Sequence, residues 1–252
     1  MQEFDTIRPY SDEETGPAIH RLVNDHEFLN TVGRFKSPAL ARWAAQREGR
    51  AKDGLDFTDP AIIKMFYMSC KKNGLSFAEA MNKLRIVPVS ISYEYDPCDG
   101  DKARELETKA RAGSYKKAEG EDTEQIMKGL TGFKGHVHVH FGAPITDAPE
   151  SAKDLAAGID REVHANYHLH ASNLVAYEMR GLHQQGINGL EAVRNSVVTA
   201  QNLSAEDVEV ARTEMERRLE ACDPAIRPYL LDMYSNPVQT ALDAHTLRNV
   251  PD

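Results

Sequence analysis

The chain has 252 residues, of which 41% are apolar and 27% are charged, a composition typical of a globular protein with a sizeable core. Its formal net charge of −9 argues against nonspecific nucleic-acid binding, so nucleic acid is not an expected partner. No apolar run approaches the roughly 20 residues that span a bilayer, and three scattered cysteines favour a reducing, cytoplasmic compartment.

The first forty residues are expected to form helices. Met1 to Asp5 lack the basic and apolar regions of a signal peptide. Ser11 and Glu14 have the spacing of a capping box. An apolar stripe at helical spacing follows, made by Ile19, Leu22, Val23, Phe28, Leu29, Val32 and Phe35.

Two more helices are predicted after a loop. Pro60 suits the first position of a helix that ends at Gly74. Ser76 can begin a short helix over residues 77–84. Residues 42–47 are ambiguous, because their alanines favour a helix over the doubtful strand that is the other interpretation.

Two segments have the composition of strands. Residues 86–95 are nearly continuous in β-branched and aromatic side chains, and residues 135–141 alternate. A turn is expected over 96–100. The segments between the strands predict a charged, solvated helix over 102–112 and a short amphipathic helix over 122–130.

The second strand carries three histidines on one face, His136, His138 and His140. Three imidazoles on one face are a candidate zinc site, and a zinc-dependent hydrolase is the alternative that they leave open. No carboxylate has a spacing that identifies it as the general base of such an enzyme. We therefore predict no metal and expect the alternate residues, Val137, Val139 and Phe141, to face the core.

From Ala152 onward the chain is predicted to be almost wholly helical. Ser204 and Asp207 can cap a helix whose apolar stripe is Val208, Ala211, Met215 and Leu219. The expected fold class is α/β, with a small, mostly parallel or mixed sheet of two to three strands, or slightly more, covered by helices. Three parts are expected: an N-terminal helical segment over 1–40, an α/β domain over 41–150 and a helical region over 151–252.

Two segments resemble the third and fourth motifs of the glycerolipid acyltransferase family. They are Gln46-Arg47-Glu48-Gly49-Arg50-Ala51-Lys52-Asp53-Gly54 and Ile86-Val87-Pro88-Val89-Ser90-Ile91-Ser92-Tyr93-Glu94. Residues 4–10, 59–65, 89–98 and 113–122 are similar to a bacterial subgroup of the same family. The resemblance covers most of the chain.

The resemblance implies a site for the phosphate of the acyl acceptor. A guanidinium fork matches a phosphate bidentately, which assigns Arg50 to the phosphate with Lys52 in support. Gly49 would let the ligand approach the backbone. Glu48 would accept a hydrogen bond from a glycerol hydroxyl or hold Arg50. Pro88 would shape the strand wall near a strand end, an edge or a bulge, because it has no N–H to donate.

The implied reaction moves an acyl group from acyl-coenzyme A or acyl-carrier protein to glycerol phosphate or lysophosphatidate. It needs no cofactor, and the implied location is the cytoplasm, with a peripheral contact at the inner membrane as an option. A non-catalytic module that binds phosphoglycerolipid or a partner protein is the alternative function.

The family's Asn-His-x-x-x-x-Asp motif is absent from this sequence, as if an internal deletion had removed it. That histidine takes the proton of the attacking hydroxyl, and its loss typically costs about 10²–10⁴-fold in rate. His20 and Asp25 have the same spacing but follow Ile19 instead of asparagine. They lie on a predicted helix, where residues five apart face each other poorly, so a surface helix is the favoured interpretation.

Overall fold

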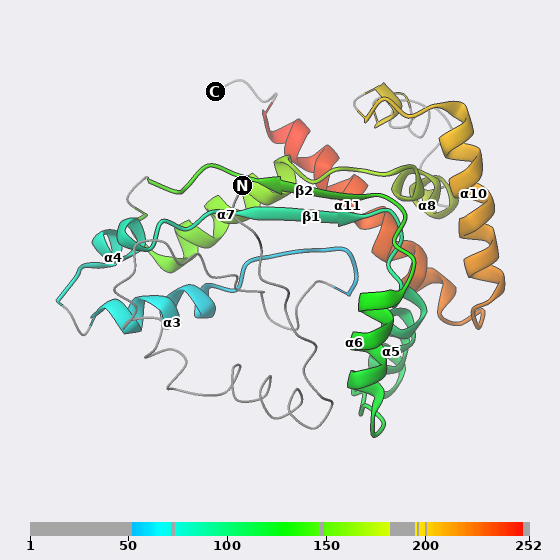
Figure 1. Cartoon of the computed structure of the whole chain (residues 1–252), viewed down its shortest axis with the longest axis horizontal. Helices are drawn as coiled ribbons and strands as arrows, with labels where there is room; N and C mark the ends of the chain where they lie inside the picture. Colours follow the sequence, from blue (N-terminus) through cyan, green and yellow to red (C-terminus); the bar gives the residue numbers. More distant parts are fainter. Residues whose placement is uncertain are drawn as a thin grey trace, which may run out of the picture.

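The computed structural model describes residues 52–71, 74–146, 149–181, 195, 197–199 and 201–248. Over these residues the chain is mostly helical, with one small sheet (Figure 1). The predicted helical segment 1–40 and the doubtful strand near 42–47 lie outside the described residues. Within the described part, no helix has the length and apolar content needed to cross a membrane.

Helices α3 (Pro60–Lys71) and α4 (Phe77–Leu84) confirm two predictions from the sequence. At the start of α4, the Ser76 Oγ accepts from the Glu79 N–H, and the Glu79 carboxylate accepts from the Ser76 N–H. This capping box satisfies two backbone donors that a helix start otherwise leaves unpaired. Both helices share a small core with α7 (Ala152–Ala165).

The sheet consists of β1 (Val89–Tyr93) and β2 (Val137–Phe141), which pair antiparallel with Ile91 opposite Val139. The expectation of a mostly parallel or mixed sheet is therefore wrong for the described strands. Helices α5 and α6 of the connection lie at one end of the sheet (Figure 1), so β2 returns in the opposite direction. A parallel pair needs a crossover connection instead.

The prediction that Val137, Val139 and Phe141 face the core is wrong, since all three are exposed. Val139 is 43% exposed and Phe141 is 68% exposed, whereas Ser92, on the opposite face of β1, is 1% exposed. The covered face is the serine face of β1, against which α7 and the connection to the next helix lie. On β2, His140 is partly buried and the other four side chains are exposed. Alternation predicts which residues share a face, but neighbouring elements decide which face is buried.

Helix α5 (Asp99–Ala112) begins inside the predicted turn, and α6 (Glu121–Thr131) lies close to its predicted range. Helix α5 was predicted to be a charged helix that faces solvent, but Ala103 and Glu105 on it are buried. Gly113 ends α5 in the left-handed conformation, with φ of 76°. None of the residues of α6 is buried.

The larger core lies between α8 (Ala171–Gly181), α10 (Ala205–Glu220) and α11 (Arg227–Arg248). The predicted capping box of Ser204 and Asp207 is confirmed at the start of α10. Of the predicted apolar stripe of α10, Val208, Ala211 and Met215 are buried in this core and Leu219 packs against it partly buried. The core also includes Ala103 from α5. Helix α5 therefore packs on the C-terminal helices, and α7 packs on the preceding α3 and α4.

Candidate functional site

Two of the residues assigned to the phosphate site lie in the described part of the chain, Lys52 and Pro88. The other three, Glu48, Gly49 and Arg50, lie outside it. His20 and Asp25, which have the spacing of the family's catalytic pair, also lie outside it.

Lys52 forms an ion pair with a buried carboxylate on α5. Its Nζ lies 2.6 Å from the Glu105 Oε1, and Lys109 Nζ lies 2.7 Å from the same oxygen. Burial acts to raise the pKa of Glu105, but the hydrogen bonds from Lys109 and Lys52 outweigh it and lower that pKa below its ordinary value. The side chain of Lys52 thus fixes the end of the predicted phosphate loop, residues 52–54, to α5.

The next two residues fix the same loop to α11. Gly54 has φ of 77°, and a Cβ added to it would lie 2.2 Å from the backbone oxygen of Met233. The Asn236 Nδ2 donates to the backbone oxygen of Asp53 over 2.7 Å. Only glycine combines this conformation with so close an approach of two backbones. The end of the loop is therefore held between two helices.

Pro88 is buried directly before β1, which confirms the expectation that it lies near a strand end. Its carbonyl oxygen accepts from the Gly142 N–H over 2.9 Å, continuing the pairing of β1 with β2. Lys52 contacts α5, which follows the other end of β1. Lys52 and Pro88 thus contact different elements, Lys52 the middle of α5 and Pro88 the residue that follows β2.

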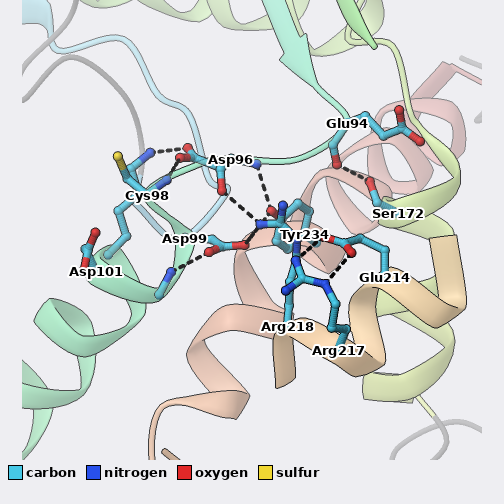
Figure 2. A network of polar contacts seen from close by, with 12 residues as sticks. Glu94, Asp96, Cys98, Asp99, Asp101, Ser172, Glu214, Arg217, Arg218 and Tyr234 are labelled. Carbon is cyan, nitrogen blue, oxygen red and sulfur yellow. Dashed lines mark hydrogen bonds and ion pairs between the residues drawn. The ribbon is translucent and has the colours of Figure 1, made fainter. Parts of the chain in front are cut away.

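A buried polar network joins the end of β1 to the C-terminal helices (Figure 2). The Arg218 Nη1 on α10 lies 2.5 Å from the Asp99 Oδ2, and the same oxygen accepts from the Tyr234 hydroxyl over 2.9 Å. That hydroxyl accepts in turn from the Asp96 N–H over 2.8 Å. Burial, strengthened by the charge of Asp99, raises the pKa of Tyr234 well above its ordinary value, so the phenol stays protonated.

We define the Asp99 network as Asp96, Asp99, Arg218 and Tyr234. Every charged group in it has a partner, since the carboxylate of Asp96 accepts from the Lys102 Nζ over 2.5 Å. A closed set of pairs of this kind fixes the geometry of packed elements. The sequence prediction assigned residues 96–100 to a turn and missed the network, because its partners are more than a hundred positions away along the chain.

A second polar group lies beneath the sheet. The rings of His138 on β2 and His168 stack with centroids 4.7 Å apart, and the rings of His168 and His170 meet edge to face at 4.8 Å. Ser90 and Ser92 are buried on the same side of the sheet as His138. We call these five residues the histidine layer.

Burial lowers the pKa of His170 to about 4, and burial also lowers the pKa of His168. Both rings are therefore neutral at pH 7, which is the form in which imidazole accepts a proton or binds a metal. Within the described residues, however, no three histidine, cysteine or acidic side chains are placed so that they could hold a metal ion. A zinc site on the second strand has no support from this arrangement.

A surface hollow of about 410 Å³ lies between α5 and α6. Four acidic residues line it, Asp101, Glu119, Glu121 and Glu124. Its two cations, Arg104 and Lys128, are both paired with Asp101. With acidic groups in excess, the hollow does not suit a phosphate.

No family model, no curated protein and no solved structure matches this chain.

Proposed function

We propose that this chain is an acyltransferase-like protein of glycerophospholipid synthesis, which binds glycerol phosphate or its monoacyl ester at the loop 46–54. Arg50 holds the phosphate in this proposal, and the acyl donor is a coenzyme A or acyl-carrier-protein thioester. Contact with the surface of the inner membrane would supply a monoacyl acceptor.

The observation that supports this proposal best is the attachment of the loop end to two helices. Lys52 is paired with Glu105 on α5, and Gly54 lies against the backbone of Met233 on α11. Fixing residues 52–54 in place reduces the entropy that this part of the site would lose when a ligand binds, which favours affinity. Binding residues commonly lie on loops that a rigid scaffold positions.

In this proposal the chain keeps the residues that bind the acceptor but lacks the residue that would catalyse acyl transfer. The family motif that supplies the general base is absent, and a guanidinium does not act as a base, because it stays protonated in proteins. We therefore infer that the chain binds the acceptor and transfers acyl groups poorly or not at all. The non-catalytic binding module is the limiting case of this proposal.

Calorimetric titration with glycerol 3-phosphate and with lysophosphatidate tests the binding. Arg50→Gln removes a charge-assisted fork, and we expect affinity to fall about 10- to 100-fold. Arg111→Gln is the matched control, since Arg111 is an exposed arginine that pairs with Glu107 on the surface of α5. Equal affinities for the two variants, or no binding by the unsubstituted chain, would reject the phosphate site.

Acyl transfer from a thioester to the same acceptors tests catalysis. We expect the unsubstituted chain to form product at the background rate, and we expect the same rate from His20→Ala. Product well above background that disappears in His20→Ala would instead identify His20 and Asp25 as the catalytic pair.

A further inference from the structure

The histidine layer joins two parts of the fold that are distant in sequence. His138 belongs to β2, whereas His168 and His170 belong to the short connection between α7 and α8. The three rings contact each other in series, at 4.7 Å and then at 4.8 Å. The seam between the sheet and this connection is therefore packed with imidazole rings.

Inside the seam, a hydrogen bond with the Ser92 backbone favours a charged His170, but the loss of hydration on burial outweighs it. His170 is 5% exposed, and its Nε2 has no hydrogen-bond partner. The hydroxyls of Ser90 and Ser92 are also buried without partners. A proton added here would be desolvated and would face neighbouring imidazoles, which costs free energy.

The acidic groups that face the layer lie at its rim and are already engaged. The Glu94 Oε2, at the end of β1, lies 2.8 Å from the His136 Nδ1 and also accepts from the His136 N–H. Glu162 on α7 lies 3.9 Å from the His140 Nε2. Asp207 on α10 interacts electrostatically with His136. The charge of Glu94 also reaches His170 and acts to raise the pKa of that ring, but burial and the neighbouring His168 outweigh it.

We propose that the seam between β2 and the α7–α8 connection is an acid-sensitive switch, closed while His168 and His170 are neutral and opened when they take up protons. Opening separates the connection from the sheet. It also releases the first turn of α8, which the Ser172 Oγ ties to the Glu94 carbonyl over 2.5 Å. This inference does not depend on the proposed function.

The direction of the effect follows from proton linkage. A histidine whose pKa is lower in the closed state contributes stability above pH 6.5, and this stability is lost as the pH falls toward the lowered pKa. The lowered value for His170 is about 4. One such group raises the opening equilibrium constant about 30-fold between pH 7.5 and pH 5. His168 shifts in the same direction and adds to this effect.

Hydrogen exchange followed by mass spectrometry measures the opening. The measurement uses the full chain, with exchange rates corrected for the intrinsic rate at each pH. We expect the protection of the amides in 137–141 and 166–176 to fall about 30-fold between pH 7.5 and pH 5. His168→Phe keeps a ring for the stack but takes no proton, so it should reduce this ratio. His170→Phe should reduce the ratio further.

His164→Asn is the matched control. His164 lies near the end of α7, and its Nε2 contacts the Asp56 carbonyl outside the layer, so this variant should keep the full ratio. The proposal is overturned if all three variants keep the ratio of the unsubstituted chain.

Proton NMR of the histidine rings gives a second test that needs no variant. Titration of His168 and His170 near pH 6.5, with exchange protection intact, would also overturn it.

Discussion

Arg218 on α10 and Asp99 at the start of α5 are 119 positions apart and form an ion pair with an Nη1–Oδ2 distance of 2.5 Å. Their side chains are 12% and 11% exposed. The guanidinium also lies over the ring of Tyr95, 4.8 Å from its centroid. This one side chain therefore connects the end of β1, the start of α5 and the C-terminal helices (Figure 2).

Arg218→Ala should lower the free energy of unfolding by about 3 kcal/mol, because it leaves the buried carboxylate of Asp99 without its cation. Urea denaturation monitored by circular dichroism measures the change. Arg111→Ala removes an exposed guanidinium of α5 and should cost less than about 0.5 kcal/mol. Similar losses in the two variants would show that the Asp99 network does not stabilise the fold.

Gly54→Ala should destabilise the chain more than Gly113→Ala. Both glycines have positive φ, 77° and 76°, so both substitutions carry the same backbone strain of about 1 kcal/mol. Gly113 has open space around it, whereas a Cβ on Gly54 meets the Met233 carbonyl. Thermal unfolding should show an additional loss of about 1–3 kcal/mol for Gly54→Ala. Equal losses would mean that the loop does not rest on α11.

Ser92→Ala and Val139→Thr test which face of the sheet is covered. The Ser92 Oγ is buried without a partner, so removing it should leave stability unchanged or raise it slightly. Val139 is partly exposed on the other face, so threonine should change stability by no more than about 0.5 kcal/mol. A loss of stability above about 1 kcal/mol for Val139→Thr would instead show that Val139 faces the core, as the alternation alone predicts.

Lys52→Met should cost about 1–2 kcal/mol at pH 7, since a hydrogen bond to a charged and buried Glu105 is lost. The pKa of Glu105 is lowered in the folded chain, so this contribution is present above the ordinary pKa of glutamate and disappears as the pH falls through the lowered one. Denaturation of both chains from pH 7 downward measures it. Lys109→Met, which removes the more exposed partner, should cost less.

Much of the local structure was predictable because its causes are local. The capping boxes at Ser76 and Ser204 lie within three residues of their partners, and the helices that follow them are where the sequence places them. The two strands were also found, from their β-branched residues and alternation. The assignment of residues 46–54 to a phosphate loop stays a prediction from resemblance, and the close approach of Gly54 to the Met233 backbone was not foreseen from the sequence.

Within the described residues, the sequence by itself therefore determined helices α3, α4 and α10, the caps of α4 and α10, and the two strands, since these depend on residues a few positions apart. Only the tertiary structure decided the direction of strand pairing, the covered face of the sheet and the partners of Lys52, Asp99 and His170. These features depend on contacts between residues distant along the chain. Such contacts form when the pairing of polar groups offsets the cost of burying them, and this cannot be judged from any single segment.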